Sequence, residues 1–268
     1  MRRFLKIFGA VFLVLVLVVV GVGVASFAGM PPVIDGVEVG SVGSGTLGSG
    51  TLGSGSVGRL VKDGYVAAYV LDIGGGKVAL VDAGNDAAAT ALLAELARRG
   101  LDASAVTDIL LTHGHPDHIA GVNRFPNAVV HALGAEVPLV ERRVGARGPV
   151  TRWFGPQDTG VRVGDPLMDG ARVPIGSRVA EVYAVPGHTT GSAVWLVDGV
   201  LFFGDSADAT TRGGMVGAKW MFTDDAGQNH TSLRALAARL APRRSEVRAL
   251  AFAHSGVLDS GDAFFRFE

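Results

Sequence analysis

The strongest constraint on this chain is a cluster of potential metal ligands that directly follows a short apolar run. Three histidines and one aspartate fall between residues 113 and 118, just after Thr107–Leu111. Imidazole nitrogens and carboxylate oxygens are common ligands of divalent metal ions. A six-residue loop is too short to aim four side chains at one tetrahedral ion, but it can divide them between two adjacent ions. The first pair is His113 and His115, and the second is Asp117 and His118.

Composition narrows the class of protein. The chain has 268 residues, of which 48% are apolar and 18% are charged, as is typical of a globular domain with an appendage. It has no cysteine, which excludes disulfides, thiolate metal sites and cysteine nucleophiles, so any metal must be held by histidine, aspartate or glutamate. Its 24 basic and 25 acidic residues balance, so we expect no nucleic-acid partner.

The first thirty residues predict a membrane segment. Three basic residues among the first six precede an uncharged stretch, Ile7–Met30, and the first charges after it are acidic. The stretch is long enough to cross a bilayer as a helix, so residues 1–30 are expected to be an N-terminal transmembrane helix. Because positive charges stay on the cytoplasmic side, residue 1 is expected in the cytoplasm. This signal-anchor would hold the domain at the membrane on its extracytoplasmic side, periplasmic or extracellular. The alternative is a cleaved signal peptide, since Ser26-Phe27-Ala28 offers small residues to a peptidase.

A glycine- and serine-rich tether is expected over residues 31–58. Its second half repeats a five-residue unit, Gly-Ser-Gly-Thr-Leu. Glycine at this density loses too much backbone entropy to hold a fixed structure without strong packing. In the alternative interpretation, Leu47, Leu52 and Val57 pair with the edge of the first sheet.

The remaining residues, 59–268, alternate strand-like apolar runs with helical patterns. Gly74-Gly75-Gly76 predicts a hairpin. Asp86 can cap a helix that ends at Arg99, and the leucine spacing predicts a second helix over Ser232–Leu240. Mixed strands and helices predict a layered α/β domain. Strands are expected at Tyr65–Ile73, Lys77–Asp82, Thr107–Leu111, Ala128–His131, Arg178–Val185, Ser192–Val197, Val200–Phe203 and Val247–Ala253.

Five short segments of this domain, taken in order, resemble those of the metallo-β-lactamase-fold hydrolases. The resemblance covers residues 60 to about 258. It implies the family's αββα sandwich, in which two sheets lie between outer helices and metal ions bind at one sheet edge. The segments are Val81-Asp82-Ala83-Gly84, the cluster at 113–118, Pro186-Gly187-His188-Thr189-Thr190-Gly191, Gly204-Asp205-Ser206 and Ala253-His254-Ser255-Gly256.

The resemblance also implies a role for each of these side chains. Asp205 would bridge two metal ions, and Asp82 would fix the loop and the tautomers of the histidines. The two divalent ions would share a bridging hydroxide as the nucleophile, and Asp117 would orient it and take up its proton. Zinc is the expected ion, and iron or manganese would also fit. The first ion would be held by His113, His115 and His188, and the second by Asp117, His118 and His254.

Within the family, the sequence favours a hydrolase of the glyoxalase II-like or lactonase-like branch over a true β-lactamase. β-Lactamases of this fold generally lack the aspartate of the fourth segment, which is Asp205 here. Glyoxalase II proteins carry a helical extension, whereas 14 residues follow His254. We expect a small-molecule substrate with an ester, lactone, thioester or phosphoester bond. The alternatives are a mononuclear iron oxidoreductase similar to persulfide dioxygenases and a non-catalytic metal-binding protein.

Two segments suggest walls for a substrate pocket. Residues 141–165 contain several arginines and Trp153, which suit a flap over an apolar or anionic group, although a solvated loop is the alternative. Residues 213–225 follow the fourth segment and form a second candidate wall. His131 and His230 fall outside the metal pattern and are expected to be structural. The sequence carries no indication of the oligomeric state.

Overall fold

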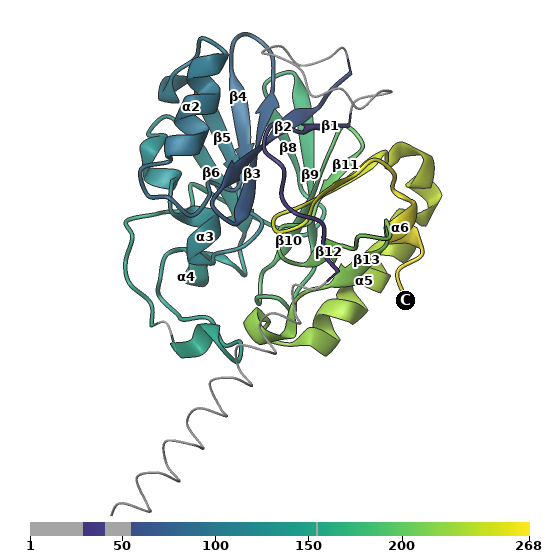
Figure 1. The fold of residues 1–268 in the computed structure, drawn as a ribbon. Helices are drawn as coiled ribbons and strands as arrows, with labels where there is room; N and C mark the ends of the chain where they lie inside the picture. The colour runs from purple at the N-terminus through teal and green to yellow at the C-terminus, as the bar shows by residue number, and fades with distance from the viewer. Residues whose placement is uncertain (1–28, 41–54, 154) are drawn as a thin grey trace, which may run out of the picture. The chain divides into compact units, whose positions relative to one another are not determined.

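The computed structural model describes residues 29–40, 55–153 and 155–268. The chain divides into two compact units, Met1–Met30 and Pro31–Glu268. The first unit lies almost wholly outside the described residues, and so does the transmembrane helix predicted there. No helix in the described ranges combines the length and the apolar character needed to cross a bilayer. The fold below is that of the second unit (Figure 1).

Two β-sheets form the centre of this unit. The first has seven strands in the order β1-β2-β3-β4-β5-β6-β7, the second has six in the order β15-β14-β11-β10-β9-β8, and β12 and β13 form a separate pair. The strands of the first sheet are β1 (Glu38–Val39), β2 (Gly58–Asp63), β3 (Val66–Asp72), β4 (Val78–Val81), β5 (Val106–Leu110), β6 (Val129–Leu133) and β7 (Asp165–Leu167). The others are β8 (Arg172–Ile175), β9 (Arg178–Ala184), β10 (Ala193–Val197), β11 (Val200–Phe202), β12 (Ala207–Ala209), β13 (Met215–Gly217), β14 (Ala249–Phe252) and β15 (Gly256–Leu258).

In the first sheet, the strand directions place two loops at one edge. β2, β3 and β4 are antiparallel neighbours, and the predicted hairpin joins β3 to β4. β4, β5, β6 and β7 then run parallel. Helix α2 (Thr90–Arg98) supplies the crossover from β4 to β5 that a parallel pair requires. Because the carboxyl ends of parallel strands meet at one edge, the residues after β4 and after β5 lie together there.

The second sheet is mostly antiparallel. β8, β9, β10 and β11 form antiparallel pairs, and β15 returns antiparallel to β14. β11 and β14 are parallel, and helix α5 (Ala226–Leu240) lies in the connection between them. The residues after β11 and after β14 therefore also meet at one edge.

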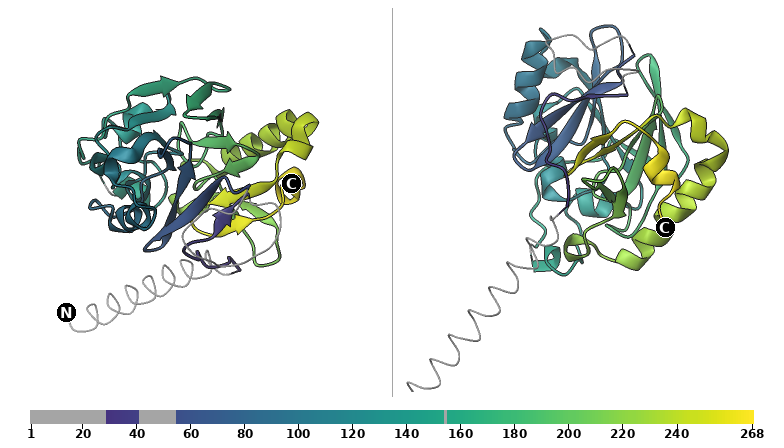
Figure 2. Two further views of the ribbon diagram at one scale, coloured as in Figure 1. Left: turned by 90° about the horizontal axis from the view of Figure 1, so that it is seen from above. Right: turned by 45° about the vertical axis from the view of Figure 1, so that its right-hand side comes forward.

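The two sheets face each other across the main hydrophobic core. Tyr69 and Leu71 of β3 pack there with Trp195 of β10 and Phe202 of β11. The outer face of the first sheet is covered by α2, α3 (Pro116–Ile119) and α4 (Val137–Val140). The outer face of the second sheet is covered by α5 and α6 (Asp262–Phe265). These four layers, visible in Figures 1 and 2, confirm the expected αββα architecture.

The strands expected from the sequence are present, but helix α5 begins earlier than predicted. It starts at Ala226, not at Ser232, because Asp225 caps it by accepting a hydrogen bond from a backbone N–H of the first turn. Glycine, asparagine and threonine in the first two turns are weak helix formers, so the sequence pattern did not predict that the helix begins at Ala226. His230 therefore lies inside the helix and not at its beginning.

The expected tether has structure at both of its described ends. Strand β1 pairs with β2, and Val39 and Val57 are buried in the main core. The middle of the tether, residues 41–54, lies outside the described residues together with Leu47 and Leu52. Strand β1 has only two residues, which is too few for a pattern of alternation to reveal it.

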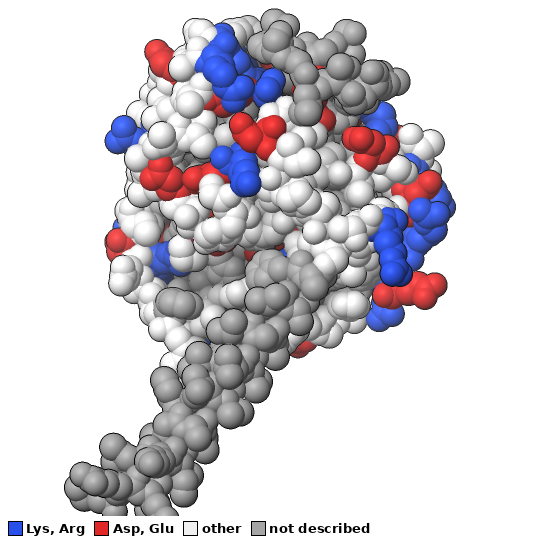
Figure 3. Space-filling model, in the orientation of Figure 1, with Lys and Arg blue, Asp and Glu red and all other residues white. Residues whose placement is uncertain are grey.

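Charged side chains of both signs are interspersed on the face in Figure 3. Acidic and basic groups lie beside one another over the visible described part of this face, separated by broad uncharged areas. This distribution matches the near-neutral formal charge of −1. The expected lack of a nucleic-acid partner stays a prediction.

Candidate metal centre

The side chains singled out in the sequence gather at one edge of the sandwich. They come from loops that follow β4 and β5 in the first sheet and β9, β11 and β14 in the second. The turn before His188 depends on Gly187, which has φ +135; a Cβ there would lie 2.2 Å from the backbone nitrogen of Asn229. The structure brings together all eight predicted residues: Asp82, His113, His115, Asp117, His118, His188, Asp205 and His254.

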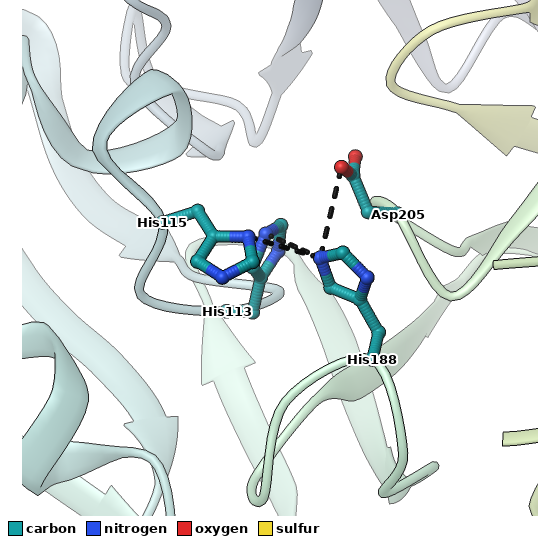
Figure 4. A group of neighbouring side chains, drawn as sticks. All are labelled: His113, His115, His188 and Asp205. Atoms are coloured by element: carbon teal, nitrogen blue, oxygen red, sulfur yellow. Dashed lines mark hydrogen bonds and ion pairs between the residues drawn. The ribbon is translucent and has the colours of Figure 1, made fainter. Parts of the chain in front are cut away.

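His113, His115, His188 and Asp205 form the first group of potential ligands, shown in Figure 4. Nε2 of His188 lies 3.2 Å from Nε2 of His113 and 3.0 Å from Nδ1 of His115. Oδ2 of Asp205 lies 3.7 Å from the same His188 atom. The three histidines are buried, so their nitrogens have little access to bulk water.

Asp117, His118 and His254 form the second group. Oδ2 of Asp117 lies 3.9 Å from Nε2 of His118 and 3.7 Å from Nε2 of His254. Asp205 connects this group to the first, because its Oδ1 is 3.1 Å from the Nε2 atoms of both His118 and His254. One carboxylate therefore lies between two sets of ligands.

Asp82 holds the loop after β5 and orients two of its histidines. Its carboxylate accepts hydrogen bonds from the backbone N–H and the hydroxyl of Thr112, at 2.8 and 2.7 Å, and from Nδ1 of His118 at 2.7 Å. Since the Thr112 hydroxyl donates to Asp82, it accepts from Nδ1 of His113 at 3.1 Å. Both imidazoles thus carry a proton on Nδ1 and direct Nε2 into the cluster.

Two contacts that the sequence analysis missed orient two more imidazoles. The Thr223 hydroxyl donates to the carbonyl oxygen of Lys219 at 2.7 Å and accepts from Nδ1 of His188 at 3.1 Å. The carbonyl oxygen of Tyr65 accepts from Nδ1 of His254 at 3.1 Å, and the Tyr65 ring stacks on that imidazole. Their Nε2 atoms therefore face the cluster, where that of His254 lies 3.1 Å from Oδ2 of Asp205. A single hydroxyl and a backbone carbonyl leave no spacing pattern that a sequence could reveal.

The chemistry of the cluster fits divalent cations. Nε2 of His115, Nε2 of His118 and Oδ1 of Asp205 are buried and make no hydrogen bond among the described atoms. The last two atoms are 3.1 Å apart but are not aligned for a hydrogen bond. Imidazole lone pairs at 3.0–3.2 Å repel one another, and buried polar atoms without partners destabilise the fold. Cations bound in the cluster would remove the repulsion between the facing imidazole nitrogens and would pair Nε2 of His118 and Oδ1 of Asp205.

Burial sets the protonation of the first group. It lowers the pKa of His113 and His188 well below the usual range, with help from neighbouring imidazoles, and that of His115 to about 4. These histidines are neutral at pH 7, which is the form that binds a metal. For His118, burial lowers the pKa, but the surrounding carboxylates, led by Asp205, outweigh it and raise the pKa well above its usual value. A cation would take the place of that proton.

Glu136 is a buried residue that the sequence analysis did not identify. One of its carboxylate oxygens accepts hydrogen bonds from the N–H of Gly114 at 2.7 Å and the hydroxyl of Thr189 at 2.8 Å. The other accepts from the N–H of Gly191 at 2.8 Å. Gly114 belongs to the loop after β5, and the other two belong to the loop after β9. One carboxylate therefore ties two histidine-bearing loops together.

The pKa of Glu136 predicts a pH-dependent contribution to stability. Burial raises this pKa from 4.5 to about 7, although its three hydrogen bonds act in the opposite direction. Because the folded pKa is the higher one, the contribution is fully present below pH 4.5 and is lost as the pH rises through 7. The free energy of unfolding of the wild type, minus that of Glu136→Gln, should fall by on the order of 3 kcal/mol across this window. Chemical denaturation of both zinc-saturated proteins at several pH values measures it, and a constant difference would contradict it.

The fold and the two ligand groups place the chain among αββα proteins with a candidate metal centre at one sheet edge. Residues 61–254 match the metallo-beta-lactamase superfamily. The chain belongs to this superfamily.

Named relatives agree with this assignment. The chain is 37% identical over 148 residues to the hydroxyacylglutathione hydrolase of Anaeromyxobacter dehalogenans, covering 55% of this chain and 48% of the relative. It is 32% identical over 176 residues to that of Pseudomonas entomophila, covering 64% and 55%. The chain thus spans about half the length of the curated relatives it matches. A metallo-beta-lactamase family protein from Thermus thermophilus has a similar structure, with 27% identity, a TM-score of 0.56, and coverage of 78% of this chain and 75% of that one.

Proposed function

We propose that the protein is a dinuclear metal-dependent hydrolase that cleaves an ester, lactone, thioester or phosphoester bond. The observation that carries the proposal is the position of Asp205 between two groups of ligands. A thioester is the substrate we favour, because the curated relatives are named for the hydrolysis of acylated glutathione. The aspartate at position 205 also weighs against a β-lactam substrate, given the family resemblance.

The residues divide into two binding sets around that aspartate. Two divalent ions, zinc by preference, would lower the pKa of a water molecule and polarise the reacting oxygen of the substrate. Asp82 holds its histidine partners in the tautomer that ligation needs. The proposed ligands are His113, His115 and His188 for one ion, Asp117, His118 and His254 for the other, and Asp205 for both.

Asp117 is the residue we expect to move a proton. It lies in the first turn of α3, and its side chain is 18% exposed, whereas that of His118 beside it is fully buried. A carboxylate that reaches both the cluster and the substrate side can accept a proton from the attacking water. It can then return the proton to the departing alcohol or thiol. Asp117 thus acts as both ligand and base in this proposal.

Metal content and turnover together test the proposal. The purified chain should contain two equivalents of zinc and should hydrolyse at least one member of a panel of lactone, thioester, β-lactam and phosphodiester probes. His115→Ala should lose metal and turnover, whereas His230→Ala, which changes a histidine outside both groups, should keep them. One equivalent of iron with oxygen consumption would instead support an oxidoreductase. Bound metal without turnover of any probe would support a non-catalytic metal-binding protein, and a chain that binds no metal after refolding would contradict the proposal.

We further propose that the hydrolase domain is exported from the cytoplasm. The support is the run of basic residues followed by the uncharged stretch Ile7–Met30. Alkaline phosphatase fused after residue 58 should be active, because that enzyme matures only outside the cytoplasm. An active β-galactosidase fusion at the same position would contradict export.

A further inference from the structure

A cleft of about 450 Å³ opens beside the first group of ligands. His115, Pro116, Arg142 and Trp153 are among the residues that line it. Trp153 is 80% exposed, so its ring presents a large apolar surface. A cleft of this size accommodates a small molecule. Its lining combines a candidate metal ligand, a cation and an aromatic ring.

Arg142 has a backbone conformation that ordinarily belongs to glycine. Its φ is 59°, and it follows the C-terminal end of α4. Its N–H donates to the carbonyl oxygen of Leu139 at 3.1 Å, and the N–H of Arg143 donates to that of Pro138 at 2.9 Å. These two hydrogen bonds define a helix end at which glycine is favoured, because a Cβ at positive φ costs about 1 kcal/mol or more. Arg142 therefore occupies a position where glycine would be less strained, and its side chain lines the cleft.

The guanidinium group of Arg142 makes no hydrogen bond or ion pair within the described part of the protein. Neighbouring arginines of the same segment differ in this respect. Arg143 pairs with Glu141 at 3.1 Å, and Arg147 pairs with Asp224 at 3.2 Å. Arg142 is partly buried, and Asp117 acts on it electrostatically without contacting it. A partly buried cation without a partner favours the binding of an anion.

We propose that Arg142 selects substrates that carry a carboxylate near the scissile bond, while Trp153 contacts the adjoining apolar chain. The planar guanidinium can donate two parallel hydrogen bonds to a carboxylate, which a lysine cannot do. This inference rests on the proposed hydrolase function. It narrows the substrate class to acyl compounds with an acidic end group.

Two matched thioesters test the inference on the zinc-loaded full-length chain. S-succinyl- and S-butyryl-N-acetylcysteamine share a neutral thiol and differ by the terminal carboxylate. Arg142→Gly should lower kcat/KM for the succinyl compound about 10- to 100-fold, mainly through KM. It should change kcat/KM for the butyryl compound by no more than about twofold. Arg142→Lys should fall between, and Arg143→Gly, which changes the exposed and paired neighbour, should match the wild type.

Two further measurements separate this inference from the proposed function. Calorimetric titration with succinate should show binding to the wild type that Arg142→Gly weakens by a similar factor, even if neither thioester is hydrolysed. The melting temperature of Arg142→Gly should be unchanged or higher, since glycine relieves the positive φ. Equal losses with both thioesters, or a lower melting temperature, would assign Arg142 a structural role and overturn the inference.

Discussion

Replacing Asp205 with alanine is expected to remove bound metal and to lower kcat/KM by at least about 10³-fold. Its carboxylate is the group that faces both sets of ligands, with one oxygen 3.1 Å from Nε2 of His118 and of His254. Its other oxygen lies 3.1 Å from Nε2 of His254 and 3.7 Å from Nε2 of His188. Without this carboxylate, one shared ligand would be missing, and the positive charge of two bound cations would be less well balanced. Elemental analysis and initial rates on the best substrate of the panel measure the effect.

A surface aspartate provides the matched control for this experiment. Asp169 is exposed and pairs with Arg239 at 2.9 Å, and neither residue belongs to a ligand loop. Asp169→Ala should keep both metal ions and full turnover. Circular dichroism should show the same fold for both variants, because position 205 lies in a loop. Full metal content and wild-type rates in Asp205→Ala would refute the dinuclear mechanism.

Replacing Trp195 with alanine is expected to lower the free energy of unfolding more than any other substitution described above. The indole is fully buried between the sheets, and its Nε1–H donates to the carbonyl oxygen of Leu111 at 2.9 Å. Removing such a ring leaves a cavity and an unsatisfied carbonyl, which together lower the free energy of unfolding by about 3–5 kcal/mol. This is a large part of the roughly 5–15 kcal/mol that is usual for whole domains. Denaturant titration of the zinc-saturated proteins measures it.

The conservative variant Trp195→Phe separates packing from hydrogen bonding. Phenylalanine keeps most of the buried ring but loses the bond to Leu111, so the loss should be about 1–3 kcal/mol. Leu111 directly follows β5 and precedes the histidine loop, so its hydrogen bond to Trp195 helps to hold that loop in place. A loss below about 1 kcal/mol in Trp195→Ala would show that the two sheets do not depend on this residue.

That the eight candidate side chains lie together could be predicted from the sequence, because each of them follows an apolar strand run. The cluster at 113–118 and the later segments gave the ligand types, and the common edge of the strands brings them together. Strand runs that are buried on both faces, such as β4 and β10, are easy to recognise because almost every residue is apolar.

Other features depend on contacts between residues that are distant in the chain. Glu136 belongs to the site only because its carboxylate accepts hydrogen bonds from Gly114 and Gly191. Its local sequence does not predict these contacts. The strands β12 and β13 have three residues each, too few for periodicity to show. The arginines of residues 141–165 differ in their contacts. Arg143 and Arg147 pair with carboxylates, whereas Arg142 lines the cleft.

The proposed ligand loops come from both sheets, and this would determine when metal ions can bind during synthesis of the protein. The ribosome delivers residues 113–118 first, whereas His188, Asp205 and His254 emerge only with the second sheet. A nascent chain that has completed the first sheet alone offers four of the seven proposed ligands, too few to hold two ions as proposed. In the proposed dinuclear arrangement, ion uptake would follow translation of His254, and the bound ions would stabilise the contact between the two sheets.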